Sequence, residues 1–305
     1  MDQVDHGMSI DEPTYLEGRL IDARYELINR IWGDQPKFFN HSLLCQVNLP
    51  YTNPGDDVRV FSRSSGKVTL QLEAGYATTS AGFEPIGLPW GARARLLMLH
   101  LCTEAIKTQS PMVEVESSFT AFARSLGLSV NGKNIRSLRD QTARMGAVTM
   151  RMFRDDDDGR YTFQGLVFSG LKAEWPKHPG QRVMWPSYVN FNADFFVSLM
   201  NHAVPLRVEA IGALRNSARS LDVYCWAASR LHRVKKPMRI SYTALQYQFG
   251  DPEHDVNSFK KSIKNALRKV VYVYPEARID LVKGGILIKN SPPPVRRRTS
   301  KKLIE

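Results

Sequence analysis

Apolar and basic residues alternate at helical spacing within residues 257–271. On a helix of 3.6 residues per turn, the apolar side chains share one face: Phe259, Ile263, Ala266, Leu267 and Val270. The opposite face carries five cations: Lys260, Lys261, Lys264, Arg268 and Lys269. The segment has no acidic residue, whereas surface helices normally mix Glu with Lys for local pairing. The pattern therefore favours a helix that offers a cationic face to a polyanion, over an ordinary solvated face.

One order of elements is predicted twice along the chain. The first copy consists of a long helix (92–107), a strand (111–115), a short helix (119–126), a basic helix (133–144) and two β-rich runs (147–153 and 161–171). The second copy consists of a helix (217–232), a strand (237–240), a short helix (242–249), the basic helix 257–271 and two strands (278–282 and 286–289). This is the order of a winged helix, whose third helix enters the major groove of DNA. The sequence thus predicts an α+β fold with two tandem winged-helix domains.

Other segments complete the predicted organisation. Helical spacing over 16–31 predicts an N-terminal helix, and apolar runs at 43–47 and 67–72 predict strands of a short β lead-in. The run Asp155–Asp158 is typical of a hairpin tip, and the Pro/Gly-rich stretch 175–180 of a linker. We therefore divide the chain into an acidic N-terminal helical segment (1–38), a first winged-helix domain with its β lead-in (39–175), a second winged-helix domain (181–291) and a disordered basic tail (292–305).

The charge is large and unevenly distributed. The chain of 305 residues has a net charge of +12. Residues 1–35 hold eight Asp or Glu against three Arg, whereas residues 201–305 hold 21 Lys or Arg against eight Asp or Glu. A basic surplus at one end indicates a nucleic-acid or anionic-surface partner there. A membrane surface is disfavoured, because no helix combines the basic face with an exposed Trp, Phe or Leu face.

Cysteine usage and the absence of an export signal favour the cytoplasm. The three cysteines, Cys45, Cys102 and Cys225, lie far apart and form no CxxC pair, which disfavours disulfide frameworks and zinc ribbons. The first residues carry no basic and apolar regions of a signal peptide. No apolar run reaches the length that spans a membrane.

Motifs for catalysis are weak. Residues 127–134 come close to a phosphate-loop pattern, but Asn134 lacks the hydroxyl that holds magnesium, and a helix instead of a strand precedes the segment. The seven histidines include no pair one residue apart, as the metal site of a rolling-circle nickase requires. His100 lies among leucines, as a core side chain does. Asp155–Asp158 could bind a cation, although a solvated hairpin tip explains them better. We expect no enzymatic activity, no metal and no cofactor.

Residues 88–107 read Leu-Pro-Trp-Gly-Ala-Arg-Ala-Arg-Leu-Leu-Met-Leu-His-Leu-Cys-Thr-Glu-Ala-Ile-Lys. The segment resembles the plasmid-encoded RepA-type replication initiators, which show Leu-Pro-aromatic-Gly, then Pro-or-Ala-Arg-Leu-Leu, then Thr-Glu-Ala. Shorter matches occur in the family's order, one upstream of this segment and the others downstream, so the resemblance covers roughly residues 40–295. They lie at 49–55, 126–127, 136–139, 204–206, 220–226, 239–242, 248–250, 274–276 and 291–294. Trp90 stands where the family usually has Tyr, and Ala94 where Pro is commoner. Both differences are changes in side-chain packing and leave the resemblance intact.

The resemblance implies a bacterial plasmid initiator that binds repeated sequences (iterons) at a replication origin. Such a protein opens the duplex or helps to open it, recruits host replication proteins such as the helicase, and forms a homodimer that represses its own gene and so takes part in copy-number control. The alternative is a winged-helix transcriptional regulator without initiator activity, which the fold alone does not exclude.

The expected partner is double-stranded DNA, and the expected contacts lie on both basic helices and one wing. Arg268 and Asn265 are the candidates for reading base edges, since Arg and Asn pair bidentately with guanine and adenine. Contacts to phosphates are expected from Lys260, Lys261, Lys264 and Lys269. The first basic helix would engage a second site or the dimer partner through Lys133, Arg136, Arg139 and Arg144. Lys283, at the tip of the second wing, would touch the DNA backbone.

Overall fold

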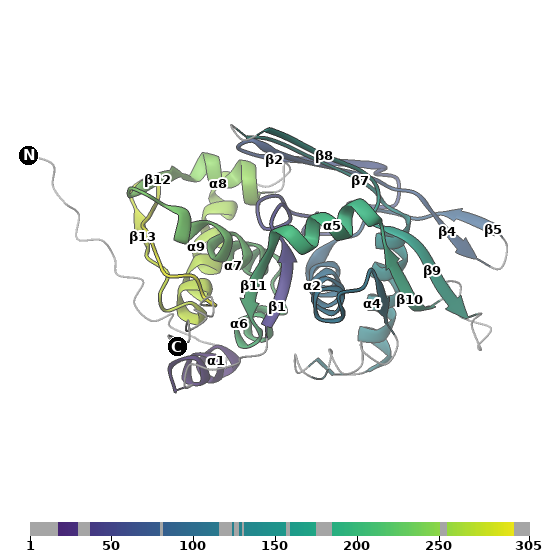
Figure 1. The fold of residues 1–305 in the computed structure, drawn as a ribbon. Coiled ribbons are helices and arrows are strands. Elements are labelled where there is room, and N and C mark those ends of the chain that lie inside the picture. Colours follow the sequence, from purple (N-terminus) through teal and green to yellow (C-terminus); the bar gives the residue numbers. More distant parts are fainter. Residues whose placement is uncertain are drawn as a thin grey trace, which may run out of the picture.

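The computed structural model describes residues 18–29, 37–79, 82–115, 124, 128–129, 131–156, 159–174, 185–250 and 255–295. Several predicted features therefore lie outside the described residues: most of the short helix 119–126, the linker 175–180 and the basic tail beyond residue 295. Within the described part, helices and small antiparallel sheets form two units that lie side by side (Figure 1). The α+β fold class predicted from the sequence is confirmed.

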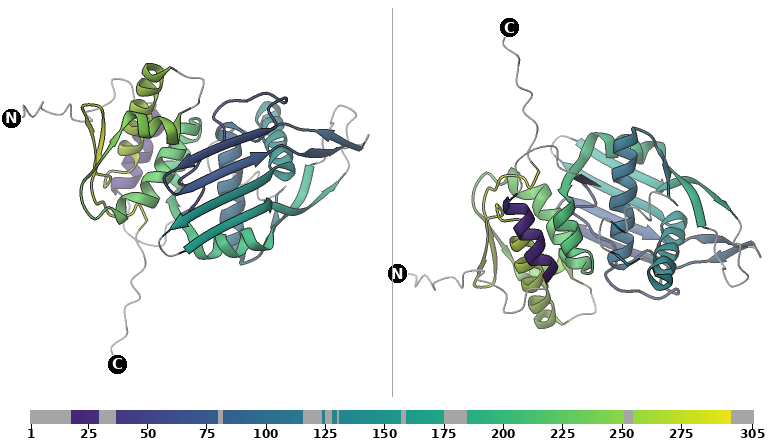
Figure 2. Two further views of the ribbon diagram at one scale, coloured as in Figure 1. Left: turned by 90° about the horizontal axis from the view of Figure 1, so that it is seen from above. Right: turned by 90° about the horizontal axis from the view of Figure 1, so that it is seen from below.

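The first unit is built around a long central helix. Its elements with the order of a winged helix are α2 (Gly91–Thr108), β6 (Met112–Glu114), α4 (Gly132–Ala147), β9 (Phe168–Glu174) and β10 (Trp185–Phe191). A second, four-stranded sheet of order β2-β3-β7-β8 lies across the unit: β2 (Val60–Ser65), β3 (Val68–Glu73), β7 (Thr149–Asp156) and β8 (Gly159–Leu166). The view from above shows this sheet in front of α2 (Figure 2). A separate hairpin projects from the far end: β4 (Tyr76–Thr79) and β5 (Gly82–Pro85).

The wing of the first unit differs from the prediction. The β-rich runs 147–153 and 161–171 were expected to form a hairpin that serves as the wing. β7 and β8 do pair as that hairpin, but β7 also pairs with β3, so the hairpin belongs to the four-stranded sheet and not to the wing. The wing is instead β9 and β10, in a sheet of order β6-β10-β9. Residues 185–191, assigned from the sequence to the second domain, thus pair with strands of the first unit. The pattern of apolar residues identifies strands but does not specify which strands pair over long separations.

The second unit follows the predicted order closely. It contains α7 (Ala218–Arg230), the short 3₁₀ helix η1 (Leu231–Arg233), β12 (Met238–Ser241), α8 (Tyr242–Phe249), α9 (Val256–Val273), β13 (Ile279–Val282) and β14 (Gly285–Ile288). The three strands form an antiparallel sheet of order β12-β14-β13. The sheet of the first unit has the same arrangement, in which the strand after the long helix pairs with the last strand of the wing.

Five elements connect the two units. They are α1 (Gly18–Asn29), β1 (Lys37–His41), α5 (Ala193–His202), β11 (Ala203–Arg207) and α6 (Val208–Leu214). β1 pairs with β11, and α1 packs against α6 and α9. The run 43–47, predicted as a strand, is instead a buried turn with hydrogen bonds such as Val47 N to Leu43 O at 3.0 Å. A short apolar run fits a buried turn as well as a buried strand, so periodicity did not distinguish them.

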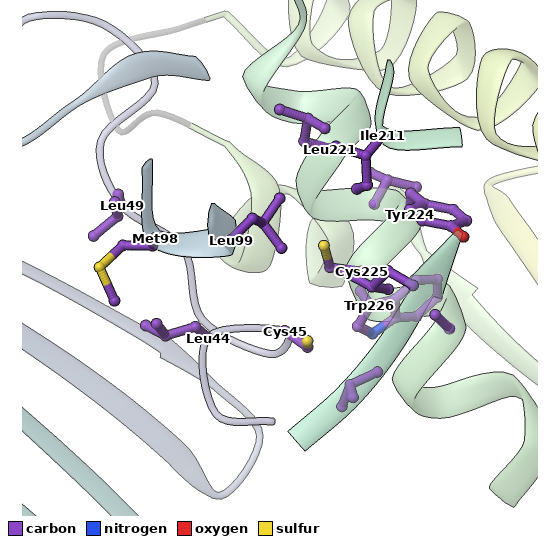
Figure 3. Close-up of a cluster of buried hydrophobic side chains, with 14 of the residues drawn as sticks. Leu44, Cys45, Leu49, Met98, Leu99, Ile211, Leu221, Tyr224, Cys225 and Trp226 are labelled. Carbon is purple, nitrogen blue, oxygen red and sulfur yellow. The ribbon is translucent and has the colours of Figure 1, made fainter. Parts of the chain in front are cut away.

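The hydrophobic core is continuous across the units. Side chains of the 43–49 turn and of α2 meet side chains of α7 in one buried cluster, which includes Cys45, Leu99 and Cys225 (Figure 3). All three cysteines are buried and free. The two units therefore share a packed interface, and α2 and α7 are in direct contact.

Candidate nucleic-acid interface

The helix α9 forms as its sequence pattern predicts. Asp255 caps its N-terminus, because the carboxylate accepts hydrogen bonds from the backbone N–H groups of Asn257 and Ser258 at 3.0 and 3.1 Å. One face is buried against the other helices of the second unit: Phe259, Ile263, Ala266, Leu267, Val270 and Val273. The cations consequently lie on the remaining surface of the helix.

The predicted DNA-binding residues of α9 differ in exposure. Lys261 and Asn265 are exposed, whereas Lys260, Lys264 and Arg268 are half-buried. The Lys264 ammonium lies 5.6 Å from the centre of the Tyr242 ring, which stabilises the cation without neutralising its charge. Among the described residues, no acidic side chain pairs with Lys260, Lys261 or Arg268. Within the described part of the chain, the outward strip of α9 is therefore positively charged and without acidic partners for these three cations.

The C-terminal end of α9 is covered by α1. Burial, aided by the charge of Arg19 on α1, lowers the pKa of Lys269. Nearby, the Arg24 guanidinium lies 4.5 Å from the centre of the Tyr272 ring. Lys269 therefore lies at the contact with α1 and apart from the exposed strip. This contact was not predictable from sequence patterns, because both helices are amphipathic and nothing local specifies which helices pack together.

The wing between β13 and β14 is held close to the start of α8. Its turn contains Lys283 and Gly284, and Gly284 has a φ of 82°, a conformation that favours glycine. The backbone N–H of Tyr242 donates to Gly284 O at 3.0 Å, and the Arg239 guanidinium donates to Lys283 O. The exposed side chain of Lys283 is thus presented beside α8, as the sequence predicts for a wing tip.

The basic helix of the first unit, α4, contributes fewer free cations than expected. Asn131 caps it by accepting from Asn134 N at 2.9 Å. Lys133 and Arg136 in its first turns are exposed, and Arg139 is half-buried. Arg144 was expected among the binding residues but is buried, where it pairs with Asp140 on the same helix and with Asp56, each at 3.0 Å. Because two carboxylates neutralise its guanidinium, Arg144 has a structural role in the packing of α4.

The two sets of cations lie in opposite halves of the molecule. α9 and α4 are separated by α7 and α2 in Figure 1, and the views in Figure 2 agree. Sequence reasoning missed two further residues at the second unit. Arg239 supports the wing turn, and the Tyr247 side chain on α8 is 77% exposed. An aromatic residue on the polar side of a short amphipathic helix was the available signal for Tyr247.

The described part of the chain holds neither a cluster of metal ligands nor a membrane-spanning helix. It contains no group of three or more His, Cys, Asp or Glu side chains placed to hold a metal ion. None of its helices has the length and apolar character needed to cross a membrane. His100 is a core residue, as predicted: it is 3% exposed, and burial lowers its pKa from 6.5 to about 3.

Two crystal structures of domains 2 and 3 of RctB share this fold. One aligns with a TM-score of 0.53 at 11% identity and covers 82% of this chain and 98% of that chain. The other aligns with a TM-score of 0.51 at 12% identity and covers 81% and 96% of the respective chains. No curated protein sequence matches. Residues 88–246, just over half of the chain, match the family described as plasmid encoded RepA protein. The chain therefore belongs to the plasmid-encoded RepA family.

Proposed function

We propose that this protein is a plasmid replication initiator that binds repeated sequences at a replication origin through its two winged-helix units. The observation that carries the proposal is the strip of cations on α9, which stands in the position of a recognition helix. Membership in the RepA family supports initiation as the purpose of this binding. Binding, without a catalytic step, is the proposed activity.

In the second unit, α9 would lie in the major groove. Asn265 and Arg268 would read base edges from the middle of the exposed strip. Lys260, Lys261 and Lys264 would bind phosphates and fix the register. Lys283 on the wing and the hydroxyl of Tyr247 on α8 would contact the backbone on either side. Lys269 has a smaller part in this proposal, because it lies against α1.

The first unit would provide a second contact through Lys133, Arg136 and Arg139. Because α4 and α9 lie in opposite halves of the molecule (Figure 1), one protomer would cover two successive segments of an origin repeat. The α4 surface is also the candidate contact between the two protomers of a homodimer that represses the initiator gene. Opening of the duplex and recruitment of a host helicase in the bacterial cytoplasm would follow origin binding.

Footprinting tests the proposal directly. Purified protein should protect short direct repeats in the DNA that flanks its gene, with two protected segments per repeat. Loss of the gene should abolish maintenance of the replicon, whereas loss of a transcriptional regulator would change expression only. Supercoiled origin DNA incubated with the protein, magnesium and ATP should show neither nicks nor release of phosphate. Absence of any sequence-specific protection would refute origin binding.

A further inference from the structure

One arginine of the first unit reaches the helix-turn-helix of the second. Arg63 lies on β2 and is 5% exposed. Its Nη2 donates a hydrogen bond of 2.6 Å to the carbonyl oxygen of Gly250, the residue that caps the C-terminus of α8. Gly250 follows α8 directly and precedes α9 in the chain. A side chain from a different unit thus holds the end of the helix that comes before the proposed recognition helix.

A second arginine, on α7, holds the same end of α8. The Nε of Arg219 donates to the carbonyl oxygen of Phe249 at 3.1 Å, and its Nη1 donates to Ser262 Oγ on α9. The last carbonyls of a helix have no partners within the helix and carry the negative end of its dipole. Two guanidinium groups on neighbouring carbonyls therefore fix the end of α8, and Arg219 connects that end to α9.

Tyr51, in the segment that precedes β2, joins the two arginines. The guanidinium carbons of Arg63 and Arg219 lie 5.1 and 4.7 Å from the centre of its ring, within the range of cation–π attraction. Arg95 of α2 lies 4.8 Å from the same ring. The Tyr51 hydroxyl is buried and has no hydrogen-bond partner among the described residues, and burial raises its pKa. Its ring, not its hydroxyl, is therefore the part that the structure uses.

We propose that Arg63 is a positioning residue for DNA recognition, which sets the orientation of α9 from the first unit through Gly250 and the Tyr51–Arg219 stack. The proposal rests on the proposed function, since it concerns the placement of the DNA-reading helix. It implies that the second unit reads DNA with full affinity only while β2 of the first unit is docked against α8, a contact that the structure contains.

The test uses the full-length chain with Arg63→Met and a matched control, Arg151→Met. Arg151 lies on β7 of the same sheet and pairs with Glu73, so the control removes the same charge without touching the second unit. Arg63→Met should weaken binding to the origin repeat by about tenfold, as expected when one charge-assisted hydrogen bond is lost. The salt dependence should stay unchanged because no phosphate contact is removed. Protection by α9 should weaken, while protection by α4 persists.

Two further variants separate geometry from charge and from folding. Arg63→Lys keeps the charge but loses the planar fork, so it should bind nearly as weakly as Arg63→Met. Tyr51→Phe keeps the stacking ring and should bind like the wild type, whereas Tyr51→Leu should resemble Arg63→Met. A fall in the salt slope of Arg63→Met, or equal affinities for Arg63→Met and Arg151→Met, would overturn the positioning role.

Amide hydrogen exchange of the free protein tests the inference without DNA. Exchange within residues 256–273 should become faster in Arg63→Met than in Arg151→Met at equal global stability. Unaltered exchange in that segment would overturn the inference even if the protein binds DNA. Conversely, faster exchange combined with no DNA binding by the wild type would show that Arg63 orders α9 but would refute the proposed function, and with it the role of Arg63 in DNA recognition.

Discussion

Arg95 on α2 and Asp222 on α7 form a bidentate ion pair across the contact between the two units. The Nε–Oδ1 and Nη2–Oδ2 distances are 2.8 and 2.7 Å, and both side chains are buried. Arg95 also donates to the backbone carbonyl oxygens of Leu49 and Pro50 at 2.6 and 3.0 Å. The Arg95 guanidinium thus donates hydrogen bonds both to α7 and to the backbone at Leu49 and Pro50. This makes the ion pair a central part of the interface between the units.

Replacement of Asp222 by Asn should destabilise the protein strongly. The change leaves the Arg95 charge buried without its anion, and loss of one partner of a buried pair costs about 3–5 kcal/mol. Urea unfolding would measure the free energy of unfolding. As a control, Lys107→Met breaks the exposed Lys107–Glu104 pair on α2 and should cost less than about 1 kcal/mol. Equal effects of the two changes would contradict the role of the buried pair.

Replacement of Lys261 by Ala should weaken DNA binding without changing specificity. The exposed ammonium is expected to bind one phosphate, so the slope of log affinity against log salt should fall by about one unit for every sequence. Lys269→Ala removes the same charge from the part of α9 that contacts α1 and should change the slope less. Titrations at several salt concentrations measure both slopes. A loss of preference at a single base pair in Lys261→Ala would argue against a phosphate contact.

Replacement of Asn265 by Ala should relax specificity at one base pair. A bidentate contact to adenine contributes about 1–3 kcal/mol of discrimination. The change should therefore lower the affinity for the repeat with the preferred base and leave the affinity for repeats with another base at that position unchanged. The same experiment with Arg268→Ala should affect a different base pair, most simply a guanine. Competition binding with a library of single-base variants of the repeat provides the measurement. Uniform weakening across the library would reassign these residues to the backbone.

Acid should destabilise the fold through two buried histidines. Burial lowers the pKa of both His41 and His100 from 6.5 to about 3. Below about pH 6.5 the unfolded state therefore binds protons that the folded state excludes, and stability falls as pH falls towards 3. From pH 7 to about pH 5.5 the two should together remove roughly 2 kcal/mol. Urea midpoints at both pH values measure the loss, and the variant with His41→Asn and His100→Gln should lose less.

The second unit was predictable because its signals are local. The limits of α8 match the predicted 242–249, and α9 begins just after the capping residue Asp255, whose side chain type is a common helix start. The periodic apolar positions of α9 are all buried. Each of these features depends on neighbours within a few turns of the chain, which is the range over which sequence patterns carry information.

Features that depend on distant partners were not predictable. The pairing of β10 with β6 joins segments more than seventy residues apart, and several pairings satisfy the same pattern of apolar residues. The neutralisation of Arg144 requires Asp56, which is equally remote. The half-burial of Lys269 arises from the packing of α1. Composition showed that the helices are basic, but only the fold distinguishes a cation that faces solvent from one that is already paired.

The shared core has a practical consequence for dissecting this protein. A fragment that began near residue 181 would carry α7 without α2, and would leave Leu221 and Cys225 facing water. It would also retain β10 without β6 and β9, as an orphan strand with unpaired edges on both sides. Such a piece should aggregate on expression, so the separate contributions of the two halves are better studied by point substitution in the intact chain than by truncation.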